Sequence, residues 1–196
     1  VDFENYSKES IQEFEDLVQE RGLNPEDILG AFHGQESKGN LPNYVYHTVF
    51  VDDIYQAIEE GQLSSQYVFT IGSDYFKEIA KMRAFFIAFE TINKTIPFIF
   101  AQTTLANKTT EQPYNNLLRT TTESMSAIFG GCDALMIRPY NQSFEEVTDF
   151  SNRLARNQHH ILREESFLEK VQDPSAGSYF IEALTKSFLK SERQEV

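Results

Sequence analysis

The sequence of 196 residues contains one cysteine, Cys132, and no tryptophan. A single cysteine cannot form an intramolecular disulfide or a cysteine-rich zinc site, and it is compatible with a reducing compartment. The sequence also lacks an apolar run long enough to span a bilayer and the hydrophobic segment of a secretion signal. We therefore expect a soluble protein of the cytoplasm.

Basic residues are scarce: 17 Lys and Arg stand against 30 Asp and Glu, which gives a formal net charge of −13. Binding to nucleic acid or to an anionic membrane depends on clustered Lys and Arg, so neither is an expected partner. The acidic residues are spread over segments with a helical pattern, such as 11–22 and 51–61. We interpret them as solvated helix faces and assign no cation site to them.

Hydrophobic residues make up 40% of the chain and include seventeen Phe, enough for the core of one domain. Four short segments rich in aromatic and branched residues read as buried parallel strands: 43–50, 67–73, 96–104 and 133–141. Because helical patterns separate them, the sequence predicts an α/β fold, either a doubly wound sheet or a (β/α)8 barrel. Four such units make about half of a barrel and leave two unpaired strand edges.

Helices are expected between and after these strands, at 73–93, 113–131, 143–166 and 178–192. The first has Asp74 near its start, the second opens at Pro113, and the third carries a Ser-x-x-Glu capping pattern at Ser143 and Glu146. The segment 30–43 is the most loop-like. The expected inner stripe of the first helix consists of Phe76, Ile79, Ala80, Arg83, Phe86, Ile87 and Glu90.

Polar residues cluster where the predicted strands end. Gln102, Thr103 and Thr104 follow one strand, and Arg138 follows the next. In parallel α/β folds the carboxyl ends of the strands carry the functional site, so these residues are candidates for it. They could equally satisfy the backbone of loops and cap helices, and the sequence leaves both interpretations open.

Three stretches, 75–84, 101–131 and 149–185, and more weakly Tyr46-His47, resemble the barrel domain of methylmalonyl-CoA mutases, with the strongest match over 67–188. The resemblance implies a partial (β/α)8 barrel of the TIM type, about its C-terminal half. It also implies an adenosylcobalamin-dependent rearrangement of methylmalonyl-CoA and succinyl-CoA, as in propionate metabolism. In such an enzyme cobalamin caps the carboxyl end of the barrel and supplies the radical chemistry.

Departures from the family pattern point to its small, non-catalytic subunit. Catalytic chains carry His where this sequence has Phe100, and a phenyl ring can neither hydrogen-bond substrate nor transfer a proton. The segments 136–140 and 159–171 also resemble small subunits, and the cobalamin-binding signature Asp-x-His-x-x-Gly is absent. The resemblance thus implies a chain with no catalytic residue, no bound cofactor of its own, and a large catalytic subunit as its partner in a heterodimer.

Gln102, Asn157 and Glu165 match positions that face the cofactor or substrate in catalytic relatives. In a non-catalytic copy we interpret them as vestigial, bracing loops at the barrel mouth. His47 could match a substrate-facing His of the family, but the residues after it depart from the pattern. The other histidines and acidic pairs are interpreted as structural: His33 in a loop, His159 and His160 diverging on a helix and therefore unsuited to one metal, and Glu164 beside Glu165.

A rival interpretation is an active acyl-CoA mutase barrel whose cobalamin domain lies on a separate polypeptide. The sequence has no initiator Met and stops within a helical pattern. We therefore expect all 196 residues to form a single fragment of the barrel domain, without a cobalamin domain. Two copies associating through their open sheet edges are the alternative way to complete the fold.

Overall fold

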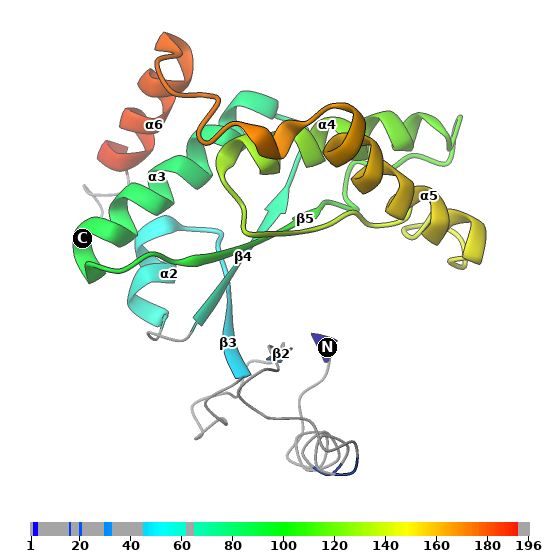
Figure 1. The fold of residues 1–196 in the computed structure, drawn as a ribbon, viewed down its shortest axis with the longest axis horizontal. Coiled ribbons are helices and arrows are strands. Elements are labelled where there is room, and N and C mark those ends of the chain that lie inside the picture. Colours follow the sequence, from blue (N-terminus) through cyan, green and yellow to red (C-terminus); the bar gives the residue numbers. More distant parts are fainter. Residues whose placement is uncertain are drawn as a thin grey trace.

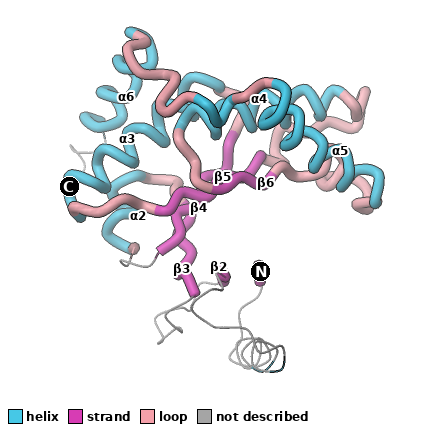
Figure 2. Tube along the Cα trace, viewed as in Figure 1, coloured by secondary structure: helices cyan, strands magenta, loops and turns pink. Residues whose placement is uncertain are grey.

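One parallel sheet organises the chain (Figure 1; Figure 2). A computed structural model describes residues 2–3, 16, 20, 30–32, 45–61 and 65–191. Within these residues the sheet has six strands in the order β1-β2-β3-β4-β5-β6, all parallel. The strands are β1 (Asp2–Phe3), β2 (Gly30–Phe32), β3 (Val45–Phe50), β4 (Ser65–Ile71), β5 (Phe98–Thr103) and β6 (Ala134–Met136).

The strand order distinguishes between the two predicted folds. A doubly wound sheet reverses its strand order at a switch point, whereas the strands of a barrel follow one another in sequence. Here every strand pairs with the next one along the chain, so the α/β fold is of the barrel type, and the described strands form part of such a barrel.

The four predicted strands are present, but two details of the prediction are wrong. The last strand ends at Met136 rather than at residue 141, because the chain leaves the sheet shortly before Pro139, which has no N–H for a further ladder bond. Gly30–Phe32, in the segment expected to be a loop, forms β2 and pairs with β3. A strand of three residues is too short to show an alternating pattern.

Helices follow the strands: α2 (Ile54–Glu60), α3 (Tyr75–Asn93), α4 (Asn115–Gly130), α5 (Asp149–His160) and α6 (Tyr179–Ser191), with a π-helical segment η2 (Ile161–Glu165) and a 3₁₀ turn η3 (Leu168–Lys170). Consecutive helices α2, α3 and α4 pack against one another, and α6 packs on α3 (Figure 1). No helix within the described residues is long and apolar enough to cross a membrane.

The start of α5 corrects the sequence prediction. Residues Asn141 to Glu145 form turns, in which the backbone N–H groups of Phe144 and Glu145 both donate to the carbonyl oxygen of Asn141. The helix starts at Asp149 instead, because Thr148 and Ser151 form a reciprocal capping box. The Ser-x-x-Glu pattern at 143–146 is therefore not the helix cap.

The helix α3 is confirmed, including its cap, since the carboxylate of Asp74 accepts from the N–H of Lys77. Its predicted inner stripe is largely wrong. Phe76 and Ile87 are 48% and 41% exposed, because α3 meets the sheet through a different side. The buried residues of α3 are Ile79, Ala80, Met82, Ala84, Phe85, Ala88 and Phe89.

Alternate side chains of β4 pack beneath α3 and form the core. Tyr67, Phe69 and Ile71 are almost completely buried, and the ring centroids of Tyr67 and Phe69 lie 4.9 and 5.2 Å from that of Phe85. A close approach of α4 to α3 requires Gly130, since a Cβ there would lie 2.9 Å from the sulfur of Met82. These contacts define the helix-facing side of the sheet.

Candidate functional site

The opposite side of the sheet, which we call the inner face, carries the alternate residues of each strand. The strand register aligns them in rows. One row, the apolar row, consists of Phe50, Val68, Phe100 and Ala134. The next row toward the carboxyl ends of the strands contains Thr70, Gln102 and Met136. The inner face therefore changes from apolar to polar within one step along the strands.

Three side chains at the carboxyl end meet in what we call the mouth cluster: Thr70, Gln102 and Arg138. The amide Nε2 of Gln102 donates to Thr70 Oγ1 at 3.0 Å, and Arg138 Nη2 donates to Gln102 Oε1 at 2.7 Å. The backbone N–H of Arg138 donates to Thr103 Oγ1 at 2.9 Å, which anchors the segment after β6 to β5. Gln102 is 7% exposed, so its orientation is fixed by these two partners.

A second polar cluster, the closed network, lies behind the same strand ends. Lys108 Nζ contacts both carboxylate oxygens of Glu123 at 2.8 and 2.9 Å, and the two side chains are 0% and 1% exposed. Asn107 joins them: its Oδ1 accepts from Lys108, and its Nδ2 donates to Glu123 and to Ser73 Oγ. The network links the loop after β5 to α4 and to the end of β4.

Burial governs the titration of this ion pair. Desolvation lowers the pKa of Lys108, and the hydrogen bond and charge of Glu123 oppose that shift. Desolvation likewise raises the pKa of Glu123, opposed by hydrogen bonds from Lys108 and Asn107. Each group thus depends on the other for its charged form. Such a pair suits a structural brace, since all of its polar atoms are already engaged.

Asn116 at the start of α4 is a second brace and is completely buried. Its Nδ2 donates to the carbonyl oxygens of Thr109 and Tyr140, and its Oδ1 accepts from the Thr109 N–H and from Arg119. One amide thereby holds together the loops that follow β5 and β6. Much of the polar sequence after β5 is therefore used for loop bracing, as one of the two open interpretations proposed.

The predicted site residues do not converge. Gln102 lies in the mouth cluster, whereas Asn157 on α5 and Glu165 in η2 are both exposed. The neighbouring Leu162 packs with Ile137 and other residues on the helix-facing side, so this part of the chain lies behind the sheet. The roles given to Gln102, Asn157 and Glu165 stay predictions.

The histidines also lie away from the mouth within the described side chains. His159 and His160 are on α5 and line a cavity on the helix-facing side. His33 lies outside the described residues, as does the side chain of His47. The side chains that the structure describes therefore present no imidazole to the mouth.

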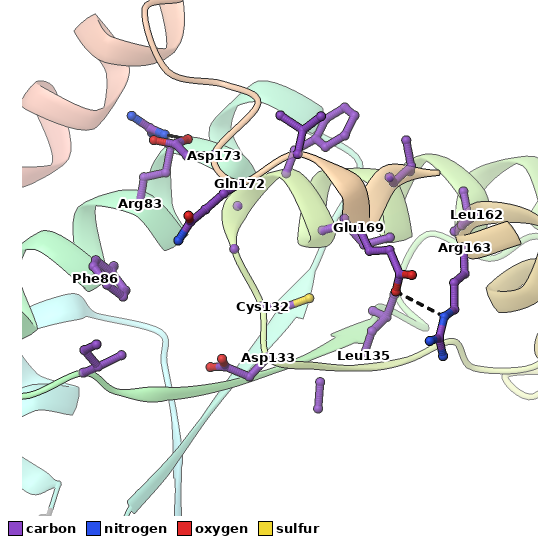
Figure 3. A pocket seen from close by; sticks show the side chains of 18 of the residues that line it. Arg83, Phe86, Cys132, Asp133, Leu135, Leu162, Arg163, Glu169, Gln172 and Asp173 are labelled. Carbon is purple, nitrogen blue, oxygen red and sulfur yellow. Dashed lines mark hydrogen bonds and ion pairs between the residues drawn. The ribbon is translucent and has the colours of Figure 1, made fainter. Parts of the chain in front are cut away.

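A cavity of about 950 Å³ lies between α3, the end of α4, the residues before β6 and the segment 159–173 (Figure 3). Its lining includes apolar side chains such as Phe86 and Leu135. It also includes the ion pair of Arg163 and Glu169, in which Nε and Oε2 lie 3.1 Å apart. Cys132 also lines the cavity, and burial raises the pKa of its thiol to about 12, so it is a poor nucleophile.

Sequence reasoning did not single out Thr70 or the pair Lys108 and Glu123. The partner of Thr70 lies on the next strand, and only the register of β4 against β5 brings them together. Lys108 and Glu123 lie 15 positions apart, in a loop and a helix. The sequence shows only that Lys108 precedes α4 and that Glu123 lies within it. Two opposite charges placed in this way are too common to predict an ion pair.

Comparisons with known proteins place this fold in one family. The sequence model of the family described as methylmalonyl-CoA mutase matches residues 57–196. The chain is 45% identical over 129 residues to the methylmalonyl-CoA mutase small subunit of Porphyromonas gingivalis, covering 61% of this chain and 21% of that one. It is 37% identical over 134 residues to the methylmalonyl-CoA mutase of Rhizobium meliloti, covering 64% and 18%.

With the methylmalonyl-CoA mutase of Escherichia coli it shares 32% identity over 182 residues, covering 84% of this chain and 26% of the relative. The chain thus spans between 18% and 26% of the length of these three relatives. The family match covers more than half of the chain and includes β4, β5, β6 and the helices α3 to α6, whereas β1, β2 and β3 lie before it. The chain therefore belongs to the methylmalonyl-CoA mutase family.

Proposed function

We propose that this chain is part of a non-catalytic, small-type subunit of a methylmalonyl-CoA mutase, which pairs with a large catalytic subunit and supports it. The observation that carries the proposal is the position of Phe100. It lies in the apolar row of the inner face, in register with Val68 and Ala134. The family resemblance implies that catalytic chains carry a histidine at this position. No proton transfer or hydrogen bond to a substrate can come from a phenyl ring there.

The relatives support the same assignment. Identity to the small subunit of Porphyromonas gingivalis is 45%, compared with 37% and 32% for the two mutases named above. In this proposal the 196 residues are one fragment of the barrel domain, and the scaffold is retained while the reactive position is apolar. Paralogous subunits commonly associate through related surfaces, so the large subunit is the expected partner.

Adenosylcobalamin would belong to the catalytic partner, where it supplies the radical chemistry. Of the three residues that the resemblance suggested, Gln102 lies at the mouth, whereas Asn157 and Glu165 lie behind the sheet. We assign these residues to bracing rather than to cofactor binding, because two of the three are exposed behind the sheet. The proposed contribution of this chain to the reaction is the stability of the complex.

Co-purification tests the proposal. The full-length protein is co-expressed with a large mutase subunit from the same organism, one of the two carries an affinity tag, and mutase activity with adenosylcobalamin is measured on each chain and on the pair. We expect a stable complex, activity in the large subunit or the pair, and none in this chain. Activity of this chain alone, or failure to form any complex, would refute the proposal.

A further inference from the structure

The segment 166–178, which we call the strap, lines one side of the cavity on the helix-facing side of the sheet (Figure 3). It joins η2 to α6 and contains η3. Leu168, Glu169 and residues 171–173 are its contribution to the lining. Cys132 lines the same cavity from the segment before β6, so the strap and the thiol border one space.

The strap buries little of its own surface. Ser175 is buried, Leu168 and Ser178 are half-buried, and the other residues of the strap are exposed. Leu168 packs against the small apolar cluster around Leu162. The backbone hydrogen bonds that lie within the strap join residues three positions apart, as in isolated turns. Few buried apolar contacts and local hydrogen bonds are typical of a segment that opens while the rest of the domain stays folded.

Backbone strain concentrates in the strap. Of the four non-glycine residues with positive φ in the described part of the chain, Phe167 (φ 51°) and Asp173 (φ 46°) both lie there, on either side of η3. A residue with a Cβ adopts this left-handed conformation where surrounding contacts hold it. The closed position of the strap therefore depends on the contacts that fix these two residues.

Arg83 on α3 holds the strap near its C-terminal end. Its Nη1 pairs with the carboxylate of Asp173, and its Nη2 lies 3.1 Å from Oε1 of Glu182 on α6 (Figure 3). The Arg83 side chain is 12% exposed, so its pairs are screened less than exposed ones. The side chains of the pair Arg163 and Glu169 are 65% and 49% exposed, and such pairs contribute little. The main ionic fastening of the strap is therefore Arg83.

We propose that the strap is a movable gate over the cavity and that the ion pair of Arg83 with Asp173 latches it shut. When this pair separates, the strap turns about Phe167 and Gly177, the left-handed residues near its two ends, and the cavity opens to solvent. The gate is built from contacts within this chain, so its failure would leave the proposed subunit role unaffected.

Alkylation of Cys132 by N-ethylmaleimide measures the opening. In the closed state burial raises the pKa of the thiol to about 12, which leaves little reactive thiolate. The full-length protein is labelled under native conditions, and mass spectrometry of the peptide that contains Cys132 gives the rate. We expect slow labelling of the wild-type protein and about tenfold faster labelling of Asp173→Asn, because this variant removes a charge-assisted bond from the latch.

The control variant is Glu169→Gln. It makes the same change from carboxylate to amide at a strap residue of similar exposure, and it should alter the labelling rate by less than about twofold, because its ion pair is exposed. Asparagine tolerates the left-handed conformation, so Asp173→Asn should keep the backbone of the closed strap.

Hydrogen exchange separates opening of the gate from unfolding of the domain. In Asp173→Asn the amides of 166–178 should exchange faster, whereas those of β4 in the core should keep their wild-type rates. Equal labelling rates in the wild type and Asp173→Asn, an equal rise in Glu169→Gln, or faster exchange throughout β4 would overturn the proposal. Labelling of the wild-type protein as fast as a small free thiol would also overturn it, since the cavity would then have no closed state.

Discussion

The closed network and the mouth cluster lie at the same end of the sheet and are built from similar residues, but they differ in how completely their polar atoms are paired. In the closed network Lys108 and Glu123 are almost completely buried, and Asn107 engages both of them. In the mouth cluster Arg138 is partly exposed and has one side-chain partner among the described residues. The polar atoms of the first arrangement are paired with one another, whereas Arg138 Nε in the second has no described partner.

The difference distinguishes fully paired from partly unpaired polar side chains at the mouth of the sheet. Polar sequence after a buried strand is ambiguous by itself, because loop bracing and ligand binding use the same residue types. The pairing of donors and acceptors resolves the ambiguity. Here the loop after β5 is braced by Asn107, Lys108 and Asn116, whereas free donors remain at Thr70 and Arg138.

The largest effect should come from breaking the closed network. Lys108→Met leaves the Glu123 carboxylate buried without a cation, and we expect the free energy of unfolding to fall by about 3–5 kcal/mol. Urea unfolding followed by circular dichroism measures this. The matched double variant, Lys108→Met with Glu123→Leu, removes both charges and should recover most of the loss. A double variant no more stable than the single one would contradict a closed ion pair.

A smaller loss is expected at the second brace. Asn116→Ala leaves two carbonyl oxygens and one N–H of the loops without their partner, which should cost about 2 kcal/mol. Asn115→Ala is the control, because Asn115 is exposed and its side chain bonds only Gln112 among the described residues; its cost should be below about 0.5 kcal/mol. Equal unfolding midpoints for the two variants would exclude Asn116 as a brace.

Phe100→His tests the apolar row. An imidazole in register with Val68 and Ala134 finds apolar neighbours, so we expect a loss of about 1–2 kcal/mol in unfolding free energy. Isomerisation of methylmalonyl-CoA should remain undetectable in this variant alone. Phe100→Leu keeps the row apolar and should be less destabilising. A histidine variant as stable as wild type, or one that is active, would contradict the interpretation of the row.

The smallest effect concerns a group outside both polar clusters. Burial, together with the charge of His160, lowers the pKa of His159 below 6.5. The unfolded chain therefore binds a proton more readily than the folded one, and stability should fall as the pH drops below 6.5, by less than about 1 kcal/mol. His159→Gln should remove this part of the pH dependence. Unfolding curves at pH 5 and pH 7.5 that shift equally in both proteins would refute it.

The sequence predicted the parts of the fold that depend on local signals. The four predicted strands, α3 with its Asp74 cap and the exit of α4 at Gly131, with φ of 88°, are each encoded within a few residues. The start of α5 was missed because Ser143 and Thr148 both offer a plausible cap, and tertiary packing decides between them. The buried side of α3 was missed because the helix contacts α2, α4, α6 and the sheet on several sides.

The site was predicted only in part. Gln102 and Arg138 were identified as residues at strand ends, but their contact depends on how β6 and the segment after it lie against β5. Thr70 needed the register of β4 for the same reason. Relations between strands are set by the packing of the whole sheet, which a pattern within one strand does not contain.

The proposed supporting role requires that this chain keep the barrel scaffold without the chemistry. The most direct test supplies the full-length protein with adenosylcobalamin, a separate cobalamin-binding domain and methylmalonyl-CoA, and measures the formation of succinyl-CoA in the absence of any large subunit. We predict no turnover, because the family resemblance places Phe100 where catalytic chains carry a histidine, and a phenyl ring can neither transfer a proton nor donate a hydrogen bond. Sustained turnover under these conditions would show that the chain is an active mutase barrel and would contradict the proposed supporting role.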